Sequence, residues 1–153
     1  MKTFEHTIDI TAPVEHVFEF DSNPENWSRT MGSMRDVEII EETDDSTRLH
    51  ATYKLLGTSM DIEMELTVVE PNEHTMITIE GDGMTGEIHN YFSETDSGTQ
   101  LRHRAEYDFG DSLFDRIVAP VASSYNKRQL RGHLQNTKEL VEAEVAAETA
   151  VPA

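Results

Sequence analysis

The chain has no cysteine, so disulfides, thiolate catalysis and cysteine-ligated metal sites are excluded. It also has no apolar run near the ~20 residues that a membrane-spanning helix needs. Its first residues carry Glu5, Asp9, Glu15 and Glu19 where a signal peptide has its apolar centre. These absences predict a cytoplasmic protein without membrane insertion.

Lysine is scarce, and Lys and Arg together number 12 against 30 Asp and Glu among 153 residues. The formal net charge of −18 repels polyphosphate, which argues against nucleic acid as a partner. The acids are spread from Glu5 to Glu148, which favours a solvated surface over one acidic patch for a basic partner. The composition therefore resembles that of proteins from salt-accumulating haloarchaea, because molar salt shortens the Debye length to about 3 Å and screens such charge.

The length suits one domain, which we place at residues 1–146, followed by a flexible tail at 147–153. Apolar and polar side chains alternate over residues 3–10, which predicts a half-buried strand. Pro13 and Pro24 then each mark the start of a short helix. The chain thus passes from a strand into two short helices within its first thirty residues.

Six further strands follow, each with apolar side chains at alternate positions and a tight turn at its end. A two-residue turn centred on residues 57–58 pairs Leu55 with Met60. An Asp-Gly turn later in the chain pairs Thr75 with Asn90. Together with the first strand, these segments predict a seven-stranded antiparallel meander with one face exposed to solvent.

From Asp111 the apolar spacing becomes helical and stays so for about thirty residues. Pro120 is expected to bend or restart this helix, because proline lacks an amide hydrogen and crowds the preceding turn. The predicted class is therefore α+β, with the long helix lying across the concave face of a curved sheet.

Two segments carry a resemblance to a known superfamily. The first is Ile10-x-Ala12-Pro13-x-x-x-Val17-Phe18 with Pro24 and Trp27, and the second is the closing helix over residues 128–142, in which Thr137 stands where leucine is usual. With the element order, they resemble the helix-grip fold of the START-like, or SRPBCC, superfamily over residues 3 to 145. The chain is most similar to its polyketide cyclase/dehydrase and lipid-transport group. That resemblance implies a cavity for a hydrophobic small molecule between the sheet and the long helix.

The alternation places a set of polar side chains on the face toward the long helix. An amide beside an imidazole on a neighbouring strand can orient it, and a histidine and a tyrosine in an apolar cavity can transfer protons. We therefore name His103 and Tyr107 as catalytic candidates, against the alternative that each polar tip is satisfied inside an ordinary core. The polar residues predicted to face inward are His6, Tyr53, Asn90, His103 and Tyr107. The ligand-binding candidates are Tyr53, Met60, Met64, Asn90, His103, Tyr107, Ile117 and Val121.

The seven histidines show no metal-ligand spacing on a helical face, so we assign no metal and no cofactor. Three functions stay open. The leading one is binding of a lipid, isoprenoid or polyketide-like molecule. The second is a cyclase or dehydratase with His103 as acid and base, and the third is a protein-interaction module without ligand. The expected state is a monomer or homodimer.

Overall fold

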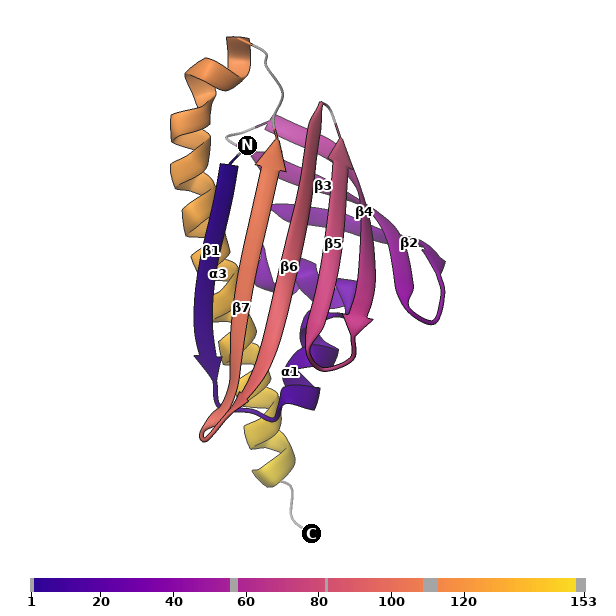
Figure 1. Ribbon diagram of the computed structural model, residues 1–153, viewed down its shortest axis with the longest axis vertical. Helices are drawn as coiled ribbons and strands as arrows, with labels where there is room; N and C mark the ends of the chain where they lie inside the picture. The colour runs from indigo at the N-terminus through magenta and orange to yellow at the C-terminus, as the bar shows by residue number, and fades with distance from the viewer. Residues whose placement is uncertain (1, 56–57, 82, 109–112, 151–153) are drawn as a thin grey trace.

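The computed structural model describes residues 2–55, 58–81, 83–108 and 113–150, with residues 2, 55, 58, 113–123, 125, 126, 149 and 150 described only as backbone. A strand, three short helical segments of which the second runs directly into the third, six strands and a long helix follow one another in the predicted order (Figure 1). The elements are β1 (Lys2–Ile10), α1 (Val14–Asp21), η1 (Pro24–Asn26), α2 (Trp27–Thr30), β2 (Met34–Glu42), β3 (Ser46–Leu55), β4 (Thr58–Glu70), β5 (His74–Gly81), β6 (Met84–Thr95), β7 (Gly98–Asp108) and α3 (Leu113–Ala150).

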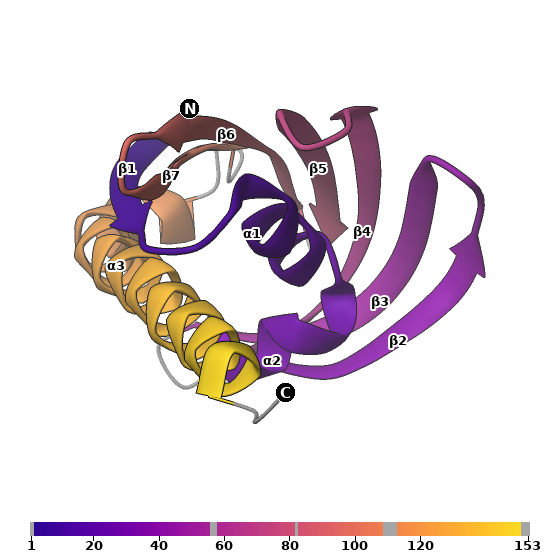
Figure 2. The ribbon, with the colours of Figure 1, turned by 90° about the horizontal axis from the view of Figure 1, so that it is seen from below.

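All seven strands form one antiparallel sheet in the order β1-β7-β6-β5-β4-β3-β2. The first strand therefore pairs with the last, and the others follow as a meander. Seen from below, the sheet curves around the interior, α1 and α2 lie at its near end, and α3 runs between them and β1 (Figure 2). The predicted helix-grip architecture is confirmed.

One predicted hairpin register is correct and one is wrong. Thr75 lies opposite Asn90, as the Asp-Gly turn predicted. Leu55, however, pairs with Thr58 and not with Met60, whose partner is Tyr53. The error is two residues, which leaves the same side chains on the inner face, so alternation alone does not detect it. The connecting residues of this hairpin lie outside the described residues.

The second of the two predicted helix starts, at Pro24, is found where the sequence places it. The side chain of Asn23 accepts a hydrogen bond from the Glu25 amide at 3.1 Å and caps the short η1 segment. At the chain end, α3 continues through Pro120 as one helix, so of the two effects expected of this proline the restart does not occur. It also extends to Ala150, four residues into the segment assigned to the tail.

Polar contacts fix α3 against the first third of the chain. Glu142 accepts from the Thr11 amide at 2.9 Å, and Glu144 lies 2.9 Å from the ring of His16. Near the middle of α3, the Asn136 amide donates to the Thr30 carbonyl at 2.9 Å. These contacts hold α1 and α2 against α3, so the three helices close one side of the interior.

The core between sheet and helix is mainly aliphatic, with Leu101, Leu134 and Val141 fully buried. Thr137 is also fully buried, although leucine is usual at this position. Its hydroxyl donates to the His133 carbonyl of its own helix at 2.9 Å. The helix therefore satisfies the additional polar atom itself, at no cost in unpaired groups.

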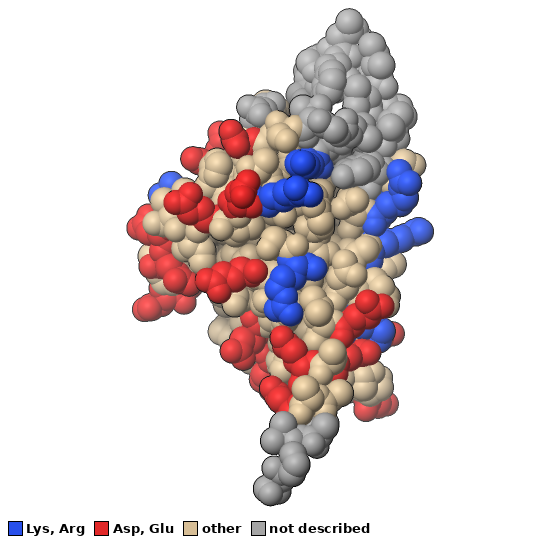
Figure 3. Space-filling view, turned by 180° about the vertical axis from the view of Figure 1, so that it is seen from behind, with Lys and Arg blue, Asp and Glu red and all other residues tan. Residues whose placement is uncertain are grey.

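The surface carries the excess of acidic residues. Figure 3 shows Asp and Glu distributed over one face around fewer Lys and Arg side chains. Because repulsion between these charges opposes compaction at low ionic strength, we expect the melting temperature to rise steeply from low to molar KCl. Thermal unfolding followed by circular dichroism, with equiosmolal sucrose as a control for solute exclusion, measures the effect. A melting temperature flat in KCl contradicts a salt-adapted surface.

Candidate functional site

A row of polar side chains crosses the concave face of the sheet. His6 on β1 lies opposite His103 on β7, and His103 lies opposite Asn90 on β6. Asn90 in turn lies opposite Thr75 on β5. Asn90, His103 and Thr75 are buried, and the Thr75 hydroxyl has no hydrogen-bond partner within the described part of the chain. Four adjacent strands thus place polar groups side by side in an otherwise apolar interior.

Within this row, Asn90 and His103 form a short hydrogen bond. His103 Nδ1 lies 2.7 Å from Asn90 Oδ1, and because a carboxamide oxygen only accepts, Nδ1 carries the hydrogen. Burial lowers the pKa of His103 to about 3, with smaller contributions from His133 and His6. The ring is therefore neutral near pH 7, and its Nε2 is left as an acceptor.

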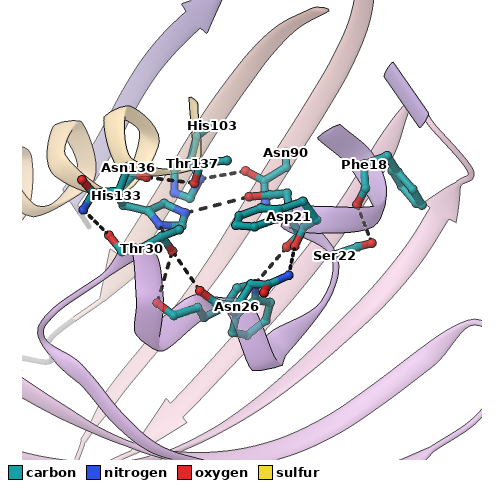
Figure 4. Close-up of polar contacts among 12 residues, drawn as sticks. Phe18, Asp21, Ser22, Asn26, Thr30, Asn90, His103, His133, Asn136 and Thr137 are labelled. Atoms are coloured by element: carbon teal, nitrogen blue, oxygen red, sulfur yellow. Dashed lines mark hydrogen bonds and ion pairs between the residues drawn. The ribbon is translucent and has the colours of Figure 1, made fainter. Parts of the chain in front are cut away.

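The helices add two titratable groups to the same region (Figure 4). His133 on α3 has its ring centroid 5.9 Å from that of His103. Its Nδ1 lies 2.9 Å from Thr30 Oγ1 and its Nε2 lies 4.0 Å from Asp21 Oδ1. Burial lowers the pKa of His133 to about 4, so this imidazole is also neutral.

Asp21 is the last residue of α1 and is 5% exposed. Burial raises the pKa of its carboxyl group to about 7. Trp27 packs beside it and donates its indole hydrogen to the Asp21 carbonyl at 2.8 Å. A buried carboxyl group between a helix end and two neutral imidazoles is an unusual arrangement, since buried charges are normally paired.

Two small cavities adjoin these groups. One of about 30 Å³ is lined by Asp21, Asn90, His103 and His133 together with apolar side chains. The other, of about 40 Å³, is lined by Tyr53, Tyr107 and His103 and by Gln129 of α3. Met31, Ile88 and His103 border both cavities. Each cavity holds about one water molecule, so a larger ligand requires side chains to move.

Tyr53 and Tyr107 form a second polar end of the interior. Burial, and then the proximity of Tyr53, raise the pKa of Tyr107. Tyr107 lies opposite Gly86, where an added Cβ would meet the ring at 2.7 Å, so the glycine lets the ring lie flat on the sheet. Tyr107 is four residues from His103 on β7, about 13 Å at the rise of a strand.

The structure brings most of the predicted ligand-binding residues to these cavities. Tyr53, His103 and Tyr107 line the larger one, and Met64, Asn90 and His103 line the smaller one. Met60 packs against the core but is not among the side chains that line either cavity. The side chains of Ile117 and Val121 lie outside the described residues.

Sequence reasoning missed Asp21 and His133 as site residues. Asp21 falls on the apolar stripe of α1 beside Val14 and Val17. A carboxyl group at a position that faces the interior indicates a candidate site residue. His133 lies between Leu130 and Thr137 at helical spacing, which places it on the inward face of α3. Both signals become informative only once α1 and α3 are known to face each other.

The arrangement suits proton transfer and hydrogen bonding. It offers a carboxyl group that changes charge near neutral pH, two neutral imidazoles and two phenols around an apolar space. Within the described ranges, no three His, Asp or Glu side chains gather closely enough to hold a metal ion. None of the described helices combines the length and hydropathy needed to cross a membrane.

A curved sheet closed by a long C-terminal helix, with polar groups in the space between them, defines a START-like protein of the helix-grip type. The sequence profile of the family described as polyketide cyclase / dehydrase and lipid transport matches residues 1–142. The chain therefore belongs to this family. Among proteins with curated functions, no sequence matches it.

Solved structures share the fold at low sequence identity. The protein TTHA0849 from Thermus thermophilus is 16% identical with a TM-score of 0.84, over 94% of this chain and 99% of that one. The Zhui aromatase/cyclase from a Streptomyces species is also 16% identical, with a TM-score of 0.84 over 98% of this chain and 99% of that one. A START superfamily protein from Mycobacterium smegmatis is 13% identical, with a TM-score of 0.69 over 95% of this chain and 97% of that one. At these identities the similarity establishes the fold alone.

Proposed function

We propose that the protein binds a hydrophobic small molecule, such as a lipid, an isoprenoid or a polyketide-like compound, between the sheet and α3. The observation that carries this proposal is the pair of adjoining cavities, which lie in an apolar interior with polar groups at both ends. Binding sites of this kind combine apolar walls with a few polar groups that orient the ligand. Membership of the family agrees with such a function.

Flexible methionine side chains allow a ligand larger than the two cavities to bind. Met31 borders both cavities, and Met34 and Met64 line the smaller one. Methionine has three rotatable bonds and a polarisable sulfur, so it adopts new rotamers at low cost. Movement of Met31 joins the two spaces into one that reaches from the Asp21 region to the tyrosines.

Native mass spectrometry of freshly purified protein, held in enough salt to stay folded before transfer, tests the proposal. We expect a fraction of the molecules to carry a co-purified apolar compound, which organic extraction releases for identification. Repeated absence of any such compound, together with failure of added hydrophobic probes to bind, contradicts the proposal. That outcome favours a protein-interaction module whose interior is filled by its own side chains.

A second candidate function is catalysis of a cyclisation or dehydration. The bond from His103 to Asn90 favours it, because it fixes the tautomer and leaves Nε2 free to accept a proton. A pKa of about 3 makes His103 a weak base that carries no proton to donate near pH 7. The proton donor in this reaction scheme is therefore Asp21 or a tyrosine.

The variant His103→Ala separates the two functions. If the protein is an enzyme of this type, turnover of a poly-β-ketone substrate is abolished while ligand affinity stays within a few fold. If it is a carrier, the wild type shows no turnover and only affinity changes. Parallel measurement of product formation and of probe affinity distinguishes these results, and an equal loss of turnover and affinity would assign His103 to binding and not to catalysis.

A further inference from the structure

We propose that the polar end of the ligand is an uncharged hydroxyl group held between Asp21, His103 and His133, and that the site rejects a carboxylate on the same hydrophobic skeleton. The inference rests on the binding function proposed above and specifies the chemical class of its ligand. It predicts hydrophobic alcohols or phenols as ligands and excludes free fatty acids.

The first support is the smaller cavity itself. Its volume of about 30 Å³ suits one water-sized group, and its polar walls come from α1, α3, β6 and β7. The remaining wall is apolar, formed by side chains that suit the adjoining hydrocarbon. The apolar residues are Trp27, Met31, Met34, Met64, Ile77 and Ile88.

The second support is the inventory of hydrogen-bond donors and acceptors. The Thr30 hydroxyl lies 3.2 Å from the Trp27 carbonyl and donates to it, so it accepts from His133 Nδ1. His133 Nε2 is then an acceptor, like His103 Nε2. Protonated Asp21 supplies a donor, because its carboxyl group keeps its proton up to about pH 7. A hydroxyl group matches this set, since it donates one hydrogen bond and accepts others.

The third support is charge. Neither Lys nor Arg is among the described residues that line the two cavities. A carboxylate would thus enter a buried space without a cationic partner, beside Asp21 and two acceptor nitrogens. Burial of an unpaired charge is strongly unfavourable, whereas a neutral hydroxyl loses little when its hydrogen bonds are replaced. The site therefore discriminates by charge at the polar end and not by the shape of the chain.

The experiment compares three probes with one C15 isoprenoid skeleton: the alcohol, the carboxylic acid and the saturated hydrocarbon. Trp27 is the only tryptophan and lines the cavity, so quenching of its fluorescence reports binding. Titrations are made in molar KCl at pH 6, where Asp21 is protonated and the probe acid is ionised. We expect the alcohol to bind at least tenfold more tightly than either other probe.

Two variants of Asp21 and one control locate the effect. Asp21→Leu should bring the affinity of the alcohol close to that of the hydrocarbon. Asp21→Asn keeps a neutral hydrogen-bond donor, as protonated Asp21 does at pH 6, so the preference for alcohol over acid should stay within about threefold of that of the wild type. Glu19→Gln makes the corresponding acid-to-amide change at an exposed position of α1 and should leave both affinity ratios unchanged. Circular dichroism confirms that each variant is folded.

The possible outcomes distinguish failure of the proposed hydroxyl site from failure of the proposed ligand-binding function. If the acid binds as tightly as the alcohol, or the alcohol no better than the hydrocarbon, the hydroxyl site is wrong while hydrophobic binding stands. If Asp21→Leu leaves the preference for alcohol intact, the hydroxyl lies elsewhere. If none of the three probes binds, the binding function itself is wrong, and this inference with it.

Discussion

Replacing Asp21 by asparagine is expected to stabilise the folded protein at pH 8 by up to about 4 kcal/mol. Burial raises the pKa of this carboxyl group from 3.8 to about 7, and each unit of pKa difference between folded and unfolded chains is worth about 1.4 kcal/mol. At pH 8 the wild type must bury a carboxylate, whereas the variant buries a neutral amide. The new amide hydrogens also need partners, so about 4 kcal/mol is the upper value.

The sign of the effect follows from the two protonation states. Because the folded pKa is raised, the stabilising contribution of protonated Asp21 is complete below pH 3.8 and is lost as the pH rises to about 7. His103 and His133 act in the opposite sense, because their folded pKa values are lowered from 6.5 to about 3 and about 4. Their contribution is complete above pH 6.5 and is lost as the pH falls toward 3. Both histidines remain in the variant, so the difference between the two proteins isolates Asp21.

Denaturant unfolding at several pH values between 4 and 8, in molar KCl, measures this difference. The advantage of Asp21→Asn should shrink as the pH falls from 8 toward 4, where both proteins carry a neutral side chain at this position. Glu19→Gln, an exposed charge removal on the same helix, should show little change at any pH. A difference between Asp21→Asn and wild type that is independent of pH would show that the carboxyl group is not desolvated as described.

The substitution Gly98→Ala is expected to destabilise the fold by at least ~3 kcal/mol. Gly98 opens β7 with φ 148°, a conformation that side-chain-bearing residues rarely adopt. An added Cβ would overlap the Ile10 carbonyl oxygen and approach the Ala12 amide nitrogen to 2.8 Å. These are backbone atoms at the end of β1, so they cannot move without disturbing the junction between sheet and α1.

The matched control is Gly83→Ala. Gly83 also has a positive φ, of 79°, but a Cβ there would meet nothing within 4 Å. The substitution Gly83→Ala should therefore lower the free energy of unfolding only by the backbone penalty of roughly 1–2 kcal/mol. Thermal unfolding of the two variants gives the difference, which combines the steric overlap at residue 98 with the larger backbone penalty at φ 148°. Equal losses at the two positions would mean that the chain relaxes around the new methyl group at residue 98.

The sequence contains enough information for the sheet and for the polar row across it. Alternation assigns His103 and Asn90 to the inner face, and the Asp-Gly turn sets Asn90 opposite Thr75. The register of the β3–β4 hairpin was wrong because a slip of two residues preserves every inward side chain. The hydrophobic pattern therefore does not decide between such registers, and the prediction rested on the assumed turn at residues 57–58 alone.

The helical half of the site was much harder to predict. Whether Asp21 meets His133 depends on how α1 and α3 are oriented across the interior, which no local periodicity determines. Asp21 and His133 approach each other to 4.0 Å although they are more than a hundred positions apart in the sequence. The sequence thus predicts the strand side of the cavity residue by residue, while the helix side follows only from tertiary packing.

The pairing of β1 with β7 also sets the order in which the chain assembles during synthesis. Among the described residues, β1 pairs only with β7, which follows it by about a hundred residues, so Phe4, Ile10 and the other apolar side chains of β1 lack this partner strand while the meander forms. Pairings of such long separation are slow, and an uncovered strand is prone to associate with other chains. The net charge of −18 opposes such association, because like charges on neighbouring copies repel each other.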